Sequence, residues 1–158
     1  MKPELARPDD ADSVYRLLND AAVWLEARGI EQWKPGALPR AVVSGGIRAA
    51  RVFVVRASDA LIATLQLEDS DPATWGADAG DALYLHRLCV ARTHAGDGLG
   101  LRLLDWAAAT ARARGRRLLR LDCVASNDAL RRYYARAGFA ERGEVDVGVR
   151  LARFERVA

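Results

Sequence analysis

The pattern of apolar positions changes three times in the middle of the chain. Residues 83–90 carry apolar or aromatic side chains on both faces, which is typical of a strand buried in a sheet. The next segment has apolar residues at helical spacing and charged residues on the opposite side; its apolar positions are Leu99, Leu103, Leu104, Ala107, Ala108 and Ala111. Residues 118–124 alternate at strand spacing. This region therefore predicts a strand, a helix that ends near Gly115, and a second strand.

Polar caps and glycines separate the remaining elements, because Asp, Ser and Asn accept bonds from the first helical amides and glycine ends the last turn. Before residue 69, the predicted elements are an edge strand at 5–7, a helix from Asp9 or Asp10 to Gly29, a weaker helix at 39–50, and a hairpin of strands at 52–57 and 61–68. Residues 69–80 have the composition of an acidic loop. At the C-terminal end, the predicted elements are a helix capped by Ser126 or Asn127, a strand that begins at Phe139, and a last strand at 149–157. Helix-linked strands in this order predict a mixed sheet with helices on its faces.

The composition is that of one soluble globular domain. The 158 residues are 51% hydrophobic and 28% charged, and a chain of this length can bury a self-supporting core. No apolar run approaches the roughly 20 residues that span a bilayer, and the N-terminal residues lack the apolar core of a signal peptide. We therefore expect a single domain over residues 1–158, a cytoplasmic location and no membrane partner.

The net charge of +3 comes from a small excess of arginines that are spread along the chain. A nucleic-acid binder typically carries a basic patch interleaved with aromatic residues, and the sequence has none. We therefore expect no nucleic-acid partner. A nucleic-acid binder is kept as the last of three interpretations, and it predicts salt-sensitive binding to random DNA.

Cys89 and Cys123 lie within apolar strand patterns, which predicts two buried thiols in a reducing compartment. His86 is three residues before Cys89 on the same strand, so alternation of side chains disfavours a Cys–His nucleophile pair. The cysteines and histidines match no metal-binding spacing, and we expect no metal site.

A glycine-rich turn, with Gly96, Gly98 and Gly100 at alternate positions, joins the strand at 83–90 to the following helix. Glycine lets the backbone adopt positive φ and lets another molecule approach closely. The first amides of a helix lack intrahelical partners and carry partial positive charge, so the turn predicts an anion site, most often for phosphate. The spacing differs from that of a nucleoside-triphosphate loop, and Leu101 replaces the third glycine of a dinucleotide loop. A plain turn between strand and helix is the alternative.

This turn resembles the pyrophosphate loop of the GNAT superfamily of N-acetyltransferases, which reads Arg/Gln-x-x-Gly-x-Gly/Ala. Gly98 and Gly100 match the two small positions, whereas Ala95 departs from the family at the Arg/Gln position. Further along, a second segment is similar to the family's Asn-x-x-Leu-x-x-Phe/Tyr-Tyr-x-x-x-Gly-Phe; the matching residues are Asn127, Leu130, Tyr133, Tyr134, Gly138 and Phe139. Two motifs in the family's order make the resemblance more specific than either motif alone.

The resemblance implies an α/β protein with the GNAT fold: a central mixed, mostly antiparallel sheet of six to seven strands, two splayed parallel strands, and helices on both faces. It implies an acyltransferase that moves an acetyl group from acetyl-CoA to a primary amine, by direct transfer within a ternary complex and without a metal. A non-catalytic acyl-CoA-binding protein on the same fold is the alternative, motivated by Ala95 and the unassigned base. Many relatives pair through a sheet edge, which raises the expectation of a homodimer.

The resemblance also assigns residues to the coenzyme. The backbone at the end of the first parallel strand pairs with the pantetheine arm, and the glycine turn holds the pyrophosphate. Asn127 contacts the pantetheine, and Tyr134 lies near the thioester sulfur. The strand residues are Leu88, Cys89 and Val90, and the turn residues are Ala95, Gly96, Asp97, Gly98, Leu99 and Gly100.

Acetyl transfer requires a base, an oxyanion donor and an acid. A free primary amine has a pKa of about 10, so a base must remove a proton near neutrality. Glu68 and His86 are the two candidate bases, and a backbone N–H near Val90 is the expected oxyanion donor. Tyr134 is the expected acid for the departing thiolate. Asp122 shares a strand face with Arg120, and we expect these two residues to pair.

The acceptor is expected to be a small-molecule or peptide amine. Acidic residues flank the expected cleft and attract a cation such as a polyamine, an amino sugar or a lysine side chain; they are Glu31, Glu68, Asp69 and Asp71. Trp24 and Trp33 belong either to the core or to the wall of this cleft, and Trp33 is the candidate substrate contact.

Overall fold

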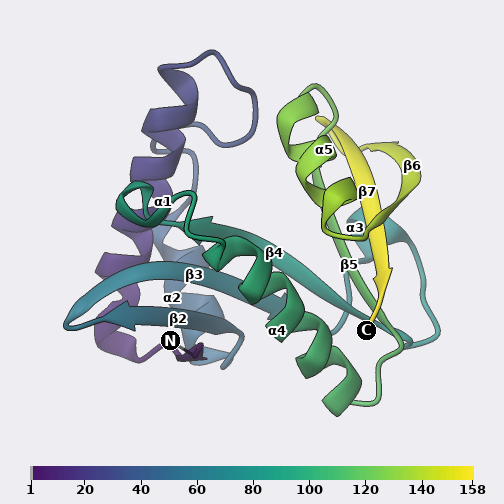
Figure 1. Cartoon of the computed structure of the whole chain (residues 1–158), viewed down its shortest axis with the longest axis horizontal. Coiled ribbons are helices and arrows are strands. Elements are labelled where there is room, and N and C mark those ends of the chain that lie inside the picture. The colour runs from purple at the N-terminus through teal and green to yellow at the C-terminus, as the bar shows by residue number, and fades with distance from the viewer. Residues whose placement is uncertain (1) are drawn as a thin grey trace. The chain divides into compact units, whose positions relative to one another are not determined.

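The computed structural model describes residues 2–158, and their strands form one seven-stranded sheet in the order β1-β2-β3-β4-β5-β7-β6 (Figure 1). β4 and β5 are parallel, and the other recorded pairs are antiparallel. The strands are β1 Glu4–Leu5, β2 Val52–Ala57, β3 Ala60–Glu68, β4 Ala82–Val90, β5 Leu118–Val124, β6 Ala140–Asp146 and β7 Arg150–Val157. The helices are α1 Ala11–Glu26, α2 Arg40–Arg48, α3 Pro72–Trp75, α4 Leu99–Ala113 and α5 Asp128–Arg136, with short 3-10 turns η1 Pro8–Asp10 and η2 Arg92–His94. The expected mixed, mostly antiparallel sheet is confirmed.

Backbone contacts divide the chain into two compact units. The first comprises the residues up to 67 together with 87–100, and the second comprises 68–86 and 101–158. Strand β4 contributes to both units and passes from the second to the first between His86 and Arg87. A single domain over residues 1–158 stays a prediction. Among residues 2–158, no helix combines the length and the hydropathy that a membrane crossing needs.

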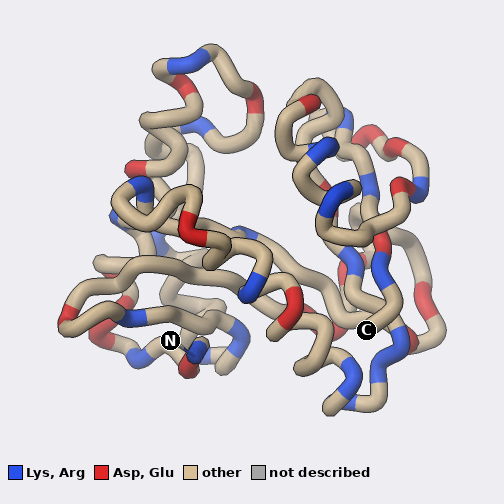
Figure 2. Tube along the Cα trace, viewed as in Figure 1, with Lys and Arg blue, Asp and Glu red and all other residues tan. Residues whose placement is uncertain are grey.

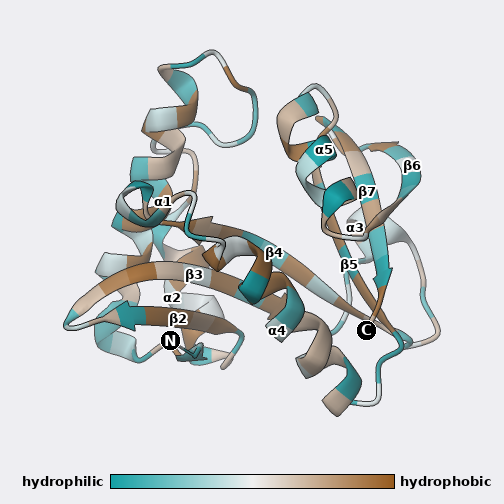
Figure 3. Ribbon diagram, viewed as in Figure 1, coloured by the Kyte–Doolittle hydropathy of each residue, from teal (hydrophilic) through white to brown (hydrophobic). Residues whose placement is uncertain are grey.

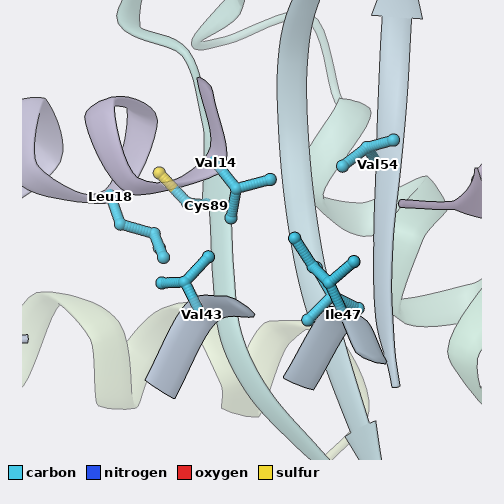
Figure 4. Close-up of a cluster of buried hydrophobic side chains, with 7 residues drawn as sticks. Val14, Leu18, Val43, Ile47, Val54 and Cys89 are labelled. Carbon is cyan, nitrogen blue, oxygen red and sulfur yellow. The ribbon is translucent and has the colours of Figure 1, made fainter. Parts of the chain in front are cut away.

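The core of the first unit is an apolar cluster under helices α1 and α2. Figure 4 shows its side chains converging from both helices, from β2 and from β4; they are Val14, Leu18, Val43, Ile47, Val54 and Cys89. Each buried aliphatic side chain of this size contributes roughly 1.5–3 kcal/mol through removal from water. Strands β2 and β3 are hydrophobic along most of their length (Figure 3), because both of their faces are largely buried. The predicted buried thiols are confirmed, since Cys89 is 5% and Cys123 is 0% exposed.

Helix α2 packs closely because it carries a glycine at its buried face. A Cβ on Gly46 would stand 3.0 Å from Val52 Cγ2 and 3.2 Å from Gln66 Oε1. Gly45, its neighbour, points where a Cβ would meet nothing nearer than 3.9 Å. Two adjacent glycines weaken the helical pattern in the sequence, and packing requires only one of them, Gly46.

In the second unit, alternate residues of β7 show which helices cover which face of the sheet. Phe154 packs against Tyr134 of α5, and Arg156 donates to the Leu104 carbonyl oxygen of α4 at 3.0 Å. Arg153 points to the other face, where its Nη1 donates to the Thr74 carbonyl oxygen of α3. Helices thus lie on both faces of this part of the sheet. The predicted apolar stripe of α4 is confirmed, because all six of its residues are buried.

Strand β4 departs from regular strand geometry at Arg87, the residue after the candidate base His86. Arg87 has a φ of +53°, a left-handed conformation that non-glycine residues seldom adopt, and its Nη1 donates to Gln66 Oε1 at 2.9 Å. The parallel ladder to β5 covers only Ala82 to Tyr84, so neither Leu85 nor His86 has a partner on β5 in the described chain. Tyr84 is therefore the last residue of β4 that pairs with β5.

Two local predictions are wrong. Asp10 stands at the start of α1, but its side chain does not cap the helix. Its carboxylate instead accepts from the Arg7 amide at 2.7 Å and from Arg56 Nη2 at 2.7 and 2.8 Å, because the guanidinium is the stronger donor. The acidic loop at 69–80 contains helix α3, which begins at Pro72 after the N-cap Asp71. Pro in the first helical turn after an Asp is a signal that favours a helix start.

Candidate functional site

The glycine turn lies in the first unit between η2 and the start of α4. Gly96 has a φ of +92° and Gly98 a φ of +70°, so both positions use conformations that favour glycine. Residues 95–98 are exposed, and a Cβ on Gly96 would meet no atom within 4 Å. Helix α4 begins directly afterwards at Leu99, and its first amides have no carbonyl four residues earlier within the helix. Open backbone at a helix N-terminus fits a diphosphate.

The position at which the family carries Arg or Gln adds no charge to this turn. Ala95 offers no cation, and its amide donates to the Arg92 carbonyl oxygen at 3.2 Å. The Arg92 guanidinium stacks on the Trp24 ring at 3.9 Å, and Arg28 stacks on the same ring at 4.0 Å. Trp24 is therefore a stacking platform for two arginines.

Tyr134 lies in α5 of the second unit and is 7% exposed. Its ring contacts Tyr133, Phe139 and Phe154, with centroids 5.6, 5.9 and 5.6 Å away. Burial raises the pKa of the Tyr134 hydroxyl well above its usual value, and nearby ionisable groups add to this effect. The hydroxyl therefore keeps its proton throughout the physiological range.

Asn127 is the N-cap of α5. Its Oδ1 accepts from the Leu130 amide at 3.1 Å, and the side chain is 6% exposed. The bond caps the first turn of the helix that carries Tyr134. This gives the Asn of the second motif a structural role. The expected contact with pantetheine stays a prediction.

Three titratable side chains from three segments of the second unit converge at His86. They are Asp71 at the start of α3, His86 on β4 and Asp122 on β5, and one ligand atom from each lies within 4.8 Å of the others. The His86 Nε2 atom is 3.4 Å from Asp71 Oδ2, a buried oxygen that forms no hydrogen bond of good geometry among residues 2–158. The other carboxylate oxygen of Asp71 accepts from the Thr74 amide at 3.2 Å.

The two carboxyl groups of this cluster respond oppositely to their surroundings. The nearby His86 imidazole holds the pKa of Asp71 below its usual value, although burial acts the other way. Burial raises the pKa of Asp122, and the charge of Asp71 raises it further while His86 opposes the change. One carboxylate is therefore ionised beside the imidazole, and the second is the more easily protonated.

The predicted pair of Asp122 with Arg120 is wrong. Arg120 Nε donates to Glu155 Oε2 at 2.7 Å, and its Nη1 donates to the Tyr84 hydroxyl at 3.2 Å. Arg120 and Glu155 are direct cross-strand partners in the β5–β7 register, whereas residues two apart on one strand are separated by roughly 6.6 Å. The closer carboxylate binds the guanidinium.

The other candidate residues fall in different surroundings. Glu68 is partly buried at the end of β3, and Glu31 is exposed. Trp33 is partly buried and packs against the α1–α2 cluster, so at least part of this ring belongs to the core. Asp69 is exposed and lies 3.5 Å from Arg116. Asp71 is 11% exposed at its side chain, so it does not belong to a surface acidic mouth.

Cys89 takes no part in a Cys–His pair. Its Sγ lies 3.7 Å from the Leu17 carbonyl oxygen within the apolar cluster, and burial raises the pKa of the thiol to about 12. Strand β4 ends with Leu88, Cys89 and Val90, shortly before η2. These are the strand-end positions at which the coenzyme prediction places the pantetheine arm. Their expected backbone bonds to pantetheine stay a prediction.

Arginines of the second unit are largely committed to carboxylates. Positive and negative residues are interspersed along this part of the trace (Figure 2), and the ion pairs are Arg120 with Glu155, Arg131 with Glu141 and Glu144, and Arg150 with Glu144. Paired charges of this kind neutralise one another locally.

Comparison with known proteins gives these features a family. The sequence model of the acetyltransferase (GNAT) family matches residues 12–139. A relative from Bacillus subtilis (strain 168), the uncharacterized N-acetyltransferase YesJ, is 37% identical over 150 residues, which cover 90% of this chain and 83% of the relative. The chain belongs to the acetyltransferase (GNAT) family, as its two motifs indicate.

Solved structures agree at the level of the fold. A GNAT-family acetyltransferase from Listeria monocytogenes 4b F2365 matches with a TM-score of 0.84 and 25% identity, over 99% of this chain and 94% of that one. The acetyltransferase yncA from Salmonella typhimurium, whose structure includes its cofactor acetyl-CoA, matches with a TM-score of 0.73 and 18% identity, over 99% and 93%. The expected GNAT fold is confirmed.

Proposed function

We propose that this chain transfers an acetyl group from acetyl-CoA to a primary amine, both substrates being bound at the same time. The observation that carries the proposal is the open glycine turn at the start of α4 in a member of an acetyltransferase family. The Salmonella relative with acetyl-CoA bound supports the choice of donor. When bound, acetyl-CoA supplies an acetyl group activated as a thioester.

The backbone carries donor binding in this proposal. Amides of residues 96–100 hold the diphosphate, and the end of β4 from Leu88 to Val90 pairs with the pantetheine arm. A backbone cradle explains why Ala95 is tolerated where the family has a long polar side chain: that side chain adds one contact to a set of main-chain donors. Asn127 contributes as the N-cap of helix α5, where its Oδ1 accepts a hydrogen bond from the Leu130 amide.

Two side chains handle protons. His86 receives the proton of the amine, because it is the candidate base with a carboxylate 3.4 Å from its ring; Glu68 is the alternative base. Tyr134 donates to the leaving sulfur in this proposal; its raised pKa keeps the hydroxyl protonated before the step but also makes it a weaker acid. A backbone N–H near Val90 stabilises the oxyanion.

The acceptor is a cationic amine in this proposal. Glu31 lies in the connection between α1 and α2, Glu68 ends β3, and Asp69 opens the β3–β4 connection; in this proposal they supply negative charge to the acceptor site. An ammonium ion is attracted to such a surface, although exposed charges act mainly on the rate of encounter. The class covers polyamines, amino sugars and lysine side chains of peptides.

A thiol-release screen tests the proposed function. The full chain is incubated with acetyl-CoA and a library of amines, and free CoA is detected with a thiol reagent. We expect amine-dependent release with at least one cationic primary amine. Release with none of the amines, together with measurable acetyl-CoA binding, contradicts catalysis and supports the acyl-CoA-binding alternative. Turnover restricted to neutral or anionic amines contradicts the acceptor class alone.

A further inference from the structure

We propose that Asp71, His86 and Asp122 form one proton-accepting unit, in which Asp71 positions the His86 ring so that Nδ1 takes the proton of the acceptor amine. This inference rests on the proposed function and extends it to two carboxylates that the sequence assigned elsewhere. His86 is the catalytic residue of the unit, and Asp71 and Asp122 are positioning residues.

The fold brings the three groups together at the end of the parallel ladder. Pairing of β4 with β5 stops at Tyr84 and Arg120, and His86 and Asp122 follow each of these by two residues on the same strand face. Because His86 has no β5 partner there, its ring and the Asp122 carboxyl face a place where the ladder has ended. Asp71 reaches the same place from the start of α3.

Asp71 is held in one orientation. Its Oδ1 is bound to the Thr74 amide at 3.2 Å, and Pro72 restricts the backbone that follows. The remaining oxygen, Oδ2, is buried and faces His86 Nε2 at 3.4 Å. A fixed carboxylate next to Nε2 favours the tautomer that carries its proton on Nε2, and this leaves the lone pair of Nδ1 as the acceptor.

One cation lies opposite the cluster, because Arg153 of β7 is the direct cross-strand partner of Asp122. Arg120 is bound to Glu155 on β7 and stacks on the Trp75 ring at 4.6 Å. Arg153, also from β7, donates to the Thr74 carbonyl oxygen and lies 5.4 Å from the same ring. Both guanidiniums therefore have partners outside the cluster, and Arg153 faces Asp122 from the neighbouring strand.

The Tyr84 hydroxyl on β4 bonds to Asp78, which removes one more donor from the cluster. In the proton-transfer step, the N–H bond of the ammonium breaks and its electron pair stays on the amine nitrogen. The new N–H bond forms at Nδ1, and the ring later releases this proton to water.

Nuclear magnetic resonance tests the arrangement without any acceptor, because the chain contains two histidines, His86 and His94. Long-range ¹H–¹⁵N spectra of the full chain labelled with ¹⁵N-histidine give the tautomer of each ring and follow its protonation. We expect His86 to be the Nε2–H tautomer in the unmodified chain, and Asp71→Asn to weaken this preference while the His94 spectrum is unchanged. A His86 signal that shows mixed tautomers and does not respond to Asp71→Asn overturns the proposal.

Kinetics with an amine from the thiol-release screen test the role in turnover. Asparagine is also a good N-cap, so Asp71→Asn keeps the start of α3 while it removes the charge. We expect kcat to fall on the order of ten- to a hundredfold, because Asp71 supplies only part of the rate gain from general-base catalysis. The KM for acetyl-CoA should be unchanged. The pH profile of kcat should also change, because the carboxylate that orients the ring is lost.

Asp122→Asn should change the pH profile of kcat as well. Asp59→Asn, in the exposed turn between β2 and β3, is the matched control and should leave the profile unchanged. A wild-type kcat and pH profile in Asp71→Asn contradicts the positioning role. Failure of the proposed function is a separate result, since it appears as absence of amine-dependent thiol release from the unmodified chain.

Discussion

At the scale of single residues, Tyr134 is the clearest case of a side chain with two roles. It fills the core between α5 and the sheet, and it carries a hydroxyl whose pKa burial raises. Tyr134→Phe removes the hydroxyl and keeps the ring contacts. We expect kcat to fall about tenfold or more while the acetyl-CoA affinity is retained, with the larger loss at high pH, where water is a poorer proton source.

Tyr133→Phe is the matched control, because the neighbouring ring is also partly buried and touches Tyr134. Steady-state kinetics across the pH range and calorimetry with acetyl-CoA give the two quantities for both variants. An unchanged maximal rate in Tyr134→Phe assigns this residue to the core alone.

Single-residue predictions from the sequence succeeded where one strand or helix determines the surroundings. The buried thiols followed from the apolar pattern around each cysteine. The pairing of Arg120 could not be predicted, because it depends on the register that places Glu155 opposite, far along the chain. The place of Asp71 beside His86 likewise requires the end of the parallel ladder, which no local pattern reveals.

At the scale of elements, helix α2 shows how packing overrides helix propensity. Its two glycines differ: a Cβ on Gly46 would press on the buried Val52 side chain at 3.0 Å, and one on Gly45 has room. We expect Gly45→Ala to raise the free energy of unfolding by about 0.5–1 kcal/mol through helix propensity. Gly46→Ala should lower it by about 1–3 kcal/mol, because overpacking outweighs that gain.

Chemical denaturation of the two variants measures the difference directly. Equal effects of both substitutions contradict the close packing of α2 on β2. Both variants make the same chemical change at adjacent positions of one helix. Any change in the free energy of the unfolded chain is therefore the same in both and cancels when their free energies of unfolding are compared.

Most elements were predictable from periodicity, since the apolar stripe of α4 and the strand at 118–124 are long and regular. The exceptions have physical reasons. Helix α3 has four residues, too few for a periodic pattern, and its only signal is an Asp before a Pro. The left-handed Arg87 in β4 is held by its bond to Gln66 on another strand, so it leaves no local signature.

At the scale of the whole molecule, the proposed function draws on both compact units. The glycine turn and the end of β4 belong to the first, and Tyr134 and the Asp71–His86–Asp122 cluster belong to the second. The family assignment covers residues from both, because the matched region runs from 12 to 139. The sequence predicted this assignment from two motifs, one in each unit, but the acceptor leaves no motif and remains a proposal.

Calorimetric titration of acetyl-CoA into the unmodified chain and into Gly98→Glu tests the central claim most directly. Glutamate at this position places a carboxylate and a Cβ where the diphosphate is proposed to lie. Gly115→Glu is the control for backbone strain, since its φ of +73° is close to the +70° of Gly98. The account predicts saturable binding to the unmodified chain and to Gly115→Glu, and none to Gly98→Glu. Unchanged affinity in Gly98→Glu, or no binding to the unmodified chain, contradicts it.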